Sequence, residues 1–239
     1  MPTAKPTTTI LLCLLFTFTA TSLSHANTHA SFLKGVKDVV KLYLSKGRIY
    51  QGQVTPCVIN NTQDSCFEGK GIYTFPNGYR YEGEFKNNKP SGAGVFTSRN
   101  GARYEGGFNN GKLDGQGVMS YGDGRHYKGS YKDNQRHGFG VMTYLDGTQY
   151  SGEFKNNMRN GYGVMTHPDG RRYEGEYKDD KREGYGVMTY QDSGLYQEGA
   201  MYEGEFKNDK RNGQGVMLYL DDGRRLNGEF INDVFINQQ

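Results

Sequence analysis

The sequence predicts an all-β fold, an elongated, twisted antiparallel sheet made of consecutive β-hairpins. The first observation is a repeat: similar segments begin every 23 residues, at Tyr81, Tyr104, Tyr127, Tyr150 and Tyr173, and such a period marks a repeat architecture. The second is composition, because 35 Gly, 19 Tyr and 13 Phe in 239 residues suit a sheet divided by turns. Hydrophobic residues make up only 34% of the chain, too few for two thick cores. We therefore expect one array and not two globular domains.

The unit from Tyr150 to Arg172 shows why each repeat is expected to form a hairpin. Residues two apart in a strand share a face. Tyr150, Gly152 and Phe154 therefore point to one face, and the polar Glu153 points to the other. Antiparallel pairing that gathers the bulky residues beside glycines on one face joins Phe154 to Gly161, Gly152 to Gly163 and Tyr150 to Met165.

Two connections complete the unit. The polar stretch 155–160 is expected to form the loop of the hairpin. Met165 must lie beside Tyr173, because a slip of one residue would send every side chain to the wrong face. This pairing makes residues 168–170 a three-residue loop, which we interpret as a type I turn with Gly170 in the left-handed conformation.

The repeated motif resembles a known family. Tyr-Glu-Gly-Glu-Phe occurs at Tyr81–Phe85 and Tyr202–Phe206, with Gly-x-Gly-Val and Asp-Gly at fixed offsets. This pattern resembles the MORN (membrane occupation and recognition nexus) repeat, and it covers residues 50–235. The resemblance implies twisted sheets of hairpins that assemble complexes and self-associate through their ends. The chain departs from the family in having no Trp, since Phe or Tyr fills that strand position.

The N-terminal segment, residues 1–26, predicts a secretory signal peptide. Lys5 supplies a positive start, residues 10–18 form a short apolar run, and residues 24–26 resemble a small-x-small cleavage site. The run is shorter than the roughly 20 residues of a membrane span. The alternative is an uncleaved membrane anchor. The sequence therefore predicts an exported protein, whether periplasmic, secreted or at the cell surface.

Residues 27–48 are predicted to form a short amphipathic helix that caps the array. Ala30–Leu44 carries apolar residues at helical spacing and lysines on the remaining surface. One interpretation is a cap on the open end of the first hairpin, because the ends of a repeat array need covering. The other is a helix that lies at the interface of an anionic membrane.

The array itself is assigned to residues 49–235, followed by a tail at 236–239. Its first unit begins at Tyr50 and carries an insertion between its strands, which is expected to be a hairpin loop containing Cys57 and Cys66. An exported protein meets an oxidising compartment, so we predict that these two cysteines form a disulfide. Closing a loop of this size would stabilise the fold by about 2 to 3 kcal/mol.

The sequence contains no pattern typical of a catalytic or metal site, and we predict no enzyme activity, metal or cofactor. His126, His137 and His167 fall at three different places in their repeats, so they do not form a ladder. The Gly-x-Gly pairs precede strands and not helices, which argues against a phosphate site. The net charge of +3 is mild and gives no indication of a nucleic acid partner.

Two repeated surfaces are candidates for binding. The first is the aromatic face, formed by Tyr104, Phe108, Tyr127, Tyr131, Tyr150, Phe154, Tyr173, Tyr177, Tyr202 and Phe206. The second is a basic edge in the hairpin loops, formed by Lys132, Arg136, Lys155, Arg159, Lys181, Arg182, Lys210 and Arg211. The basic edge is either a solvated border that prevents aggregation or a contact for an acidic partner or anionic lipid.

The function hypothesis is a non-catalytic scaffold, acting outside the cytoplasm, that holds a protein or peptide partner or a second copy of itself. The resemblance to MORN repeats supports it. The alternative is attachment to anionic phospholipid through the basic loops and the N-terminal helix, a role proposed for the family from its plant lipid-kinase members.

Overall fold

The computed structural model describes residues 39–44, 48–59, 62–191 and 199–236. Every helix or strand element in these ranges is a β-strand, so the all-β prediction is confirmed. The strands are β1 (Val39–Leu44), β2 (Arg48–Ile59), β3 (Thr62–Thr74), β4 (Arg80–Lys86), β5 (Lys89–Thr97), β6 (Arg103–Asn109), β7 (Lys112–Ser120), β8 (His126–Lys132), β9 (Gln135–Thr143), β10 (Gln149–Lys155), β11 (Met158–Thr166), β12 (Arg172–Lys178), β13 (Lys181–Tyr190), β14 (Ala200–Lys207), β15 (Lys210–Tyr219), β16 (Arg225–Ile231) and β17 (Val234–Ile236).

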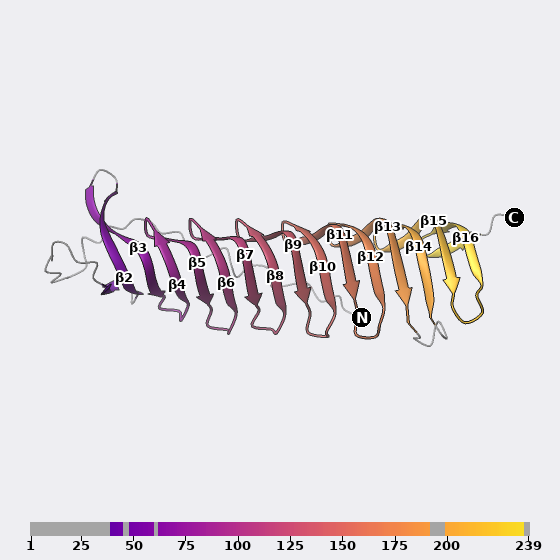
Figure 1. Ribbon diagram of the computed structural model, residues 1–239, viewed down its shortest axis with the longest axis horizontal. Helices are drawn as coiled ribbons and strands as arrows, with labels where there is room; N and C mark the ends of the chain where they lie inside the picture. The colour runs from indigo at the N-terminus through magenta and orange to yellow at the C-terminus, as the bar shows by residue number, and fades with distance from the viewer. Residues whose placement is uncertain (1–38, 45–47, 60–61, 192–198, 237–239) are drawn as a thin grey trace. The chain divides into compact units, whose positions relative to one another are not determined.

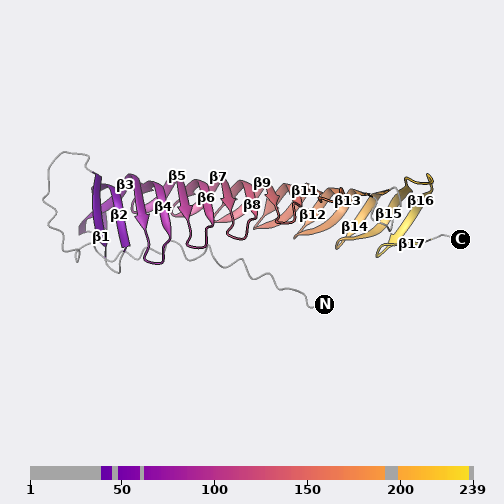
Figure 2. The same ribbon diagram turned by 90° about the horizontal axis from the view of Figure 1, so that it is seen from below.

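The chain divides into two compact units. The first comprises Met1–Gly122 and Tyr131–Asn134, and the second comprises Asp123–Ser130 and Gln135–Gln239. In the first unit each strand from β1 to β7 pairs antiparallel with the next. The same holds from β9 to β17 in the second unit. Each unit is therefore a sheet of consecutive hairpins, as the order of the arrows shows (Figure 1, Figure 2).

The hairpin register of β10 and β11 is partly as predicted. Tyr150 pairs with Met165 and Gly152 with Gly163, but Phe154 lies opposite Arg159 and not Gly161. A bulge next to Gly152 accounts for the difference. Because the shift is by two residues, each side chain keeps its predicted face.

The loop predicted at residues 155–160 is wrong for the same reason. Lys155 pairs with Met158, which leaves a two-residue turn at Asn156 and Asn157 with φ of 51° and 71°. Two successive positive φ angles define a type I′ turn, which matches the twist of the strands, and asparagine tolerates this conformation. The strands are therefore longer than the polar composition of this stretch suggests.

The next connection confirms the predicted three-residue loop. Met165 pairs with Tyr173. Gly170 has a φ of 84°, and its N–H donates to the carbonyl of His167 at 2.9 Å. The Asp169 carboxylate accepts a hydrogen bond from the Arg171 N–H at 3.1 Å, which fixes the turn.

Paired glycines make room for a tyrosine that lies across them. A Cβ on Gly152 would lie 2.5 Å from the Cα of Gly163 and 2.5 Å from the Tyr150 hydroxyl, so no side chain fits there. Tyr150 is completely buried, and its ring makes edge-to-face contacts with Phe154 and Tyr177, with 5.1 Å between centroids in each case. The arrangement recurs at Tyr81, Tyr104, Tyr127, Tyr173 and Tyr202. These rings form the hydrophobic core on one side of each sheet, which we call the aromatic face.

The N-terminal helix prediction is wrong where the structure tests it. Val39–Leu44 forms strand β1, and it pairs antiparallel with β2 so that Leu42 lies opposite Tyr50. Pairing satisfies the backbone groups along the edge of β2, and β-branched residues such as Val39 suit a strand. The remainder of the expected helix, residues 27–38, and the predicted signal peptide, residues 1–26, lie outside the described residues.

The insertion in the first hairpin extends its strands and does not form the expected loop. β2 and β3 continue past the usual length, with Cys57 opposite Asp64 and Cys66 opposite Thr55. Cys66 is buried and disulfide-bonded. The side chain of Cys57 lies outside the described residues, so its pairing with Cys66 stays a prediction.

Candidate interaction surfaces

The aromatic face is a packed core in this structure. The ten side chains proposed as a binding face are between 0% and 5% exposed. Tyr150 also donates a hydrogen bond from its hydroxyl to the carbonyl of Glu153 at 3.0 Å, which satisfies a polar group at the bulge. The same bond, three residues along the chain, recurs at Tyr50, Tyr81, Tyr104, Tyr127, Tyr173 and Tyr202. Burial raises the pKa of Tyr177 to about 12.

The basic edge separates into two kinds of residue. Its four lysines, Lys132, Lys155, Lys181 and Lys210, are exposed, whereas its four arginines, Arg136, Arg159, Arg182 and Arg211, are half-buried. The Arg159 guanidinium lies 5.8 Å from the Tyr150 ring centroid and 5.1 Å from that of Tyr177, within the range of a cation–π interaction. The other three arginines cover ring pairs in the same way. The arginines therefore cover the core.

Each covering arginine is also tied to the next hairpin turn. The N–H and Nε of Arg159 donate to Asp180 Oδ1 at 2.9 and 3.2 Å, and the Asp180 N–H returns a hydrogen bond to the Arg159 carbonyl at 3.0 Å. Asp209 and Asp233 hold Arg182 and Arg211 in the same way. We call this reciprocal bond an inter-repeat clamp. Three of the four arginine charges are thus paired with carboxylates.

The clamp has apolar and neutral forms earlier in the chain. Asn88 accepts from the Phe67 N–H and Asn134 from the Leu113 N–H. Between them, Pro90 has no N–H and Gly111 has no side-chain acceptor, so only the backbone bond from Gly111 N–H to the Pro90 carbonyl remains, at 2.8 Å. The clamp is therefore a property of the repeat, and charge is added to it only in the second unit.

A hollow of about 820 Å³ lies on the aromatic face of the second unit. Its lining includes the three clamped arginines Arg159, Arg182 and Arg211, together with His167 and Asp169. His167 Nδ1 lies 3.2 Å from the Thr148 hydroxyl. In the part of the chain that the structure describes, no group of three or more His, Cys, Asp or Glu residues could hold a metal ion. No helix in the described ranges is long and apolar enough to cross a membrane.

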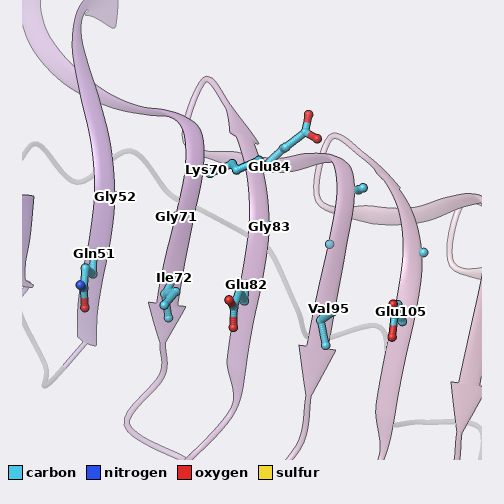
Figure 3. Close-up of a pocket in the computed structure, with 13 residues that line it drawn as sticks. Gln51, Gly52, Lys70, Gly71, Ile72, Glu82, Gly83, Glu84, Val95 and Glu105 are labelled. Atoms are coloured by element: carbon cyan, nitrogen blue, oxygen red, sulfur yellow. The ribbon is translucent and has the colours of Figure 1, made fainter. Parts of the chain in front are cut away.

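The opposite face of the sheet carries a groove over the glycine row in the first unit. It has a volume of about 690 Å³. Figure 3 shows glycines such as Gly71 and Gly83 between two rows of side chains, with Ile72 and Glu82 on one side and Glu84 on the other. The position between the two glycines of Gly-x-Gly is occupied there by Lys70 and Ala93, which are a flexible and a small residue.

In the second unit aromatic side chains occupy this opposite face. Phe139, Tyr162 and Tyr185 are 61%, 53% and 50% exposed. The Tyr162 hydroxyl donates to Glu174 Oε1 at 2.7 Å and the Tyr185 hydroxyl to Glu203 Oε1 at 2.8 Å. We call Phe139, Tyr162 and Tyr185 the exposed aromatic row. The sequence analysis missed this row, although its three residues occupy the variable middle position of the repeated Gly-x-Gly motif.

Glutamates alternate with the row on the intervening strands. Glu153 pairs with Phe139, while Tyr162 and Tyr185 pair with Glu176 and Glu205. Among the described residues, no salt bridge involves Glu153, Glu176, Glu203 or Glu205, whereas Glu174 is paired with Arg172. The surface is thus aromatic and acidic, opposite in sign to the basic edge.

Comparison with known families matches these repeats to one model, the MORN repeat. It matches residues 67–78, 81–103, 104–124, 127–149, 150–171, 173–195 and 202–224, more than half of the chain. The chain belongs to the MORN repeat family. In this MORN protein, each matched segment except the first, 67–78, begins at the tyrosine that crosses a glycine pair.

Solved structures show weak similarity to this MORN array. The TCP domain of SAS-4 (dCPAP) from Drosophila melanogaster, in complex with a proline-rich motif of Ana2, is 13% identical, covering 72% of this chain and 87% of that one, with a TM-score of 0.40. The G-box domain of the microcephaly protein CPAP is 14% identical, covering 81% and 100%, with a TM-score of 0.43. Similarity this low carries no functional inference. A comparison with curated proteins found no match.

Proposed function

We propose that this MORN-repeat protein is a non-catalytic interaction scaffold that binds a protein partner through the exposed aromatic row. The observation that carries the proposal is the exposure of Phe139, Tyr162 and Tyr185 at the same position of three successive repeats. Single exposed apolar residues are ordinary on a protein surface, but aligned ones form a patch. Aromatic residues are also enriched where proteins contact each other.

The row is large enough to support a contact. An aromatic side chain buries about 150 to 250 Å², and these three are about half exposed, so docking would remove roughly 300 Å² from water. At about 25 cal/mol per Å² this contributes on the order of 7 kcal/mol before the cost of association. Two of the three rings, Tyr162 and Tyr185, are also held by hydroxyl bonds to Glu174 and Glu203, which lowers the entropy lost on binding.

The aromatic face acts as a structural framework for the exposed row. Its rings are buried and its arginines are clamped to the next turn, so it holds each repeat at a fixed spacing from the next. A partner at the aromatic face would first have to displace the covering arginines, whereas the row is already accessible. Attachment to anionic lipid has less support, because three of the four edge arginines are ion-paired with Asp180, Asp209 and Asp233.

We further propose that the scaffold acts outside the cytoplasm. The support is the sequence of residues 1–26, with its sparse positive start, short apolar run and small-x-small site. Mass measurement of the protein recovered from outside the cytoplasm should give a chain that begins near Asn27. A chain that keeps residues 1–26 would contradict the cleaved signal.

Selection from a random peptide library tests the contact surface. The purified full chain is compared with the variant Phe139→Gln/Tyr162→Gln/Tyr185→Gln, because glutamine already occupies this position at Gln116 and Gln214. We expect selected peptides to bind the wild type and to lose at least tenfold in affinity with the variant.

The control removes other exposed apolar side chains. Leu145 and Leu220 are 70% and 53% exposed and lie in turns. The variant Leu145→Gln/Leu220→Gln should bind selected peptides as the wild type does, and circular dichroism should show that both variants are folded. Peptides that bind all three proteins equally, or binding of anionic vesicles that depends on the four edge lysines and not on the row, would overturn the proposal.

A further inference from the structure

Resting on the proposed function, we infer that the segment bound by the exposed aromatic row is a proline-rich, basic stretch in the polyproline II conformation. It would lie across the strands of the second unit, from β9 to β13, with one helical turn for each ring. Three features of the row support this partner: the spacing of the rings, the way the rings are held, and the charge around them.

The rings are spaced as the turns of a polyproline II helix are spaced. Phe139 lies on β9, Tyr162 on β11 and Tyr185 on β13, so successive rings are two strands apart. Neighbouring strands are about 4.8 Å apart, which separates the rings by about 9.6 Å. A polyproline II helix repeats every three residues, or about 9.3 Å. Over two intervals the mismatch is only about 0.6 Å.

Other peptide conformations fit the row less well. Side chains on one face of a β-strand recur every ~6.8 Å and then at ~13.5 Å, so they fall between the rings. Residues seven apart in an α-helix are ~10.5 Å apart, which accumulates to a mismatch of ~1.8 Å over the row. The spacing therefore favours polyproline II.

Two of the three rings, those of Tyr162 and Tyr185, lean over the neighbouring glycines. Tyr162 lies in the register line of Glu176, but its hydroxyl bonds to Glu174, two residues along β12. The phenol thus leans across the line of Gly163 and Gly175, where no side chain stands in its way. Tyr185 leans in the same direction toward Glu203. A ring that leans over a glycine row presents its face to solvent, and proline-rich helices dock on such aromatic surfaces.

The charge around the rings favours a basic partner. Glu153, Glu176 and Glu205 alternate with the rings along the row, and Glu203 borders it. None of the four takes part in a salt bridge among the described residues. A partner with one lysine or arginine in each turn would place a cation near each interval between rings, as electrostatic complementarity requires.

Fluorescence anisotropy with four labelled peptides tests the inference. The probe is (Pro-Pro-Lys)4. Its comparisons are (Pro-Pro-Glu)4, which reverses the charge, (Pro-Pro-Pro-Lys)3, which changes the period of the charge, and (Ala-Ala-Lys)4, which keeps charge and period without the polyproline II preference. We expect the probe to bind the full chain at least tenfold more tightly than each comparison. Its affinity should fall as salt is raised to about 0.5 M.

The Gln variant of the row separates the possible results. Phe139→Gln/Tyr162→Gln/Tyr185→Gln should weaken the probe at least tenfold, while Leu145→Gln/Leu220→Gln should not change it. Equal binding of (Ala-Ala-Lys)4, or no loss in the row variant, would overturn the inference. If library peptides need the row but lack proline, the scaffold function stands and this partner class is rejected. If sedimentation shows a dimer that only the row variant dissociates, the occupant is a second copy of the chain.

Discussion

Replacing Tyr150 by Phe should destabilise the protein although the ring is retained. The Tyr150 hydroxyl bonds to the carbonyl of Glu153 at 3.0 Å, next to the bulge where Glu153 has no register partner on β11. Without the hydroxyl, a part-buried carbonyl loses a partner, which costs about 1 to 3 kcal/mol. For a chain of this size each kcal/mol lowers the melting temperature by about 2 to 4 °C. We therefore expect a decrease of about 2 to 12 °C.

Tyr162→Phe provides a matched control in the same repeat. Its hydroxyl also forms a hydrogen bond, to Glu174 at 2.7 Å, but the side chain is half exposed and water can replace that bond. Its cost should stay within about 0.5 kcal/mol. Thermal unfolding followed by circular dichroism measures both variants. Equal shifts for the two variants would refute the assignment of Tyr150 to the core and Tyr162 to the surface.

Three further predictions concern the core, the clamp and the cysteines. The pKa of Tyr177 is about 12 in the folded protein against about 10 in the unfolded chain, so the neutral phenol favours the folded state. This contribution to stability is intact below about pH 10 and is lost as the pH rises through about 12. Near-ultraviolet titration should show a group of tyrosines that ionise only as the protein unfolds. Asp180→Ala should cost about 1 to 2 kcal/mol more than Asp179→Ala in urea unfolding, because both residues have positive φ but only Asp180 holds Arg159. Unreduced, denatured protein should take up no alkylating reagent at Cys57 or Cys66, and labelling of either thiol would contradict the disulfide.

The sequence was sufficient to predict the faces of the strands but not their full register. Alternation with a period of two places Tyr150 and Phe154 on one face whatever the loop length. A register shift of two residues preserves that alternation, so parity could not distinguish Gly161 from Arg159 as the partner of Phe154. The deciding feature was the tolerance of Asn156 and Asn157 for positive φ, which closes a tighter turn and moves the extra residues into a bulge.

The candidate sites were harder to predict because their character depends on contacts between repeats. The sequence analysis assigned Arg159 to a basic edge in the hairpin loops, because the clamp to Asp180 that lays it over the rings joins residues 21 apart. The exposed aromatic row was missed for another reason. The sequence search followed positions that recur, whereas Tyr162 occupies a position that changes from repeat to repeat.

The missing side-chain bond between Pro90 and Gly111 affects how this part of the array can evolve. An acceptor introduced at 111 alone would find no N–H on the proline, and an N–H introduced at 90 alone would find no side-chain acceptor on the glycine. Neither substitution gains the missing bond by itself, whereas Pro90→Leu with Gly111→Asn would reproduce the arrangement of Leu113 and Asn134. The effects of substitutions at positions 90 and 111 thus depend on each other. We expect the two positions to change together in evolution, although they lie in different repeats.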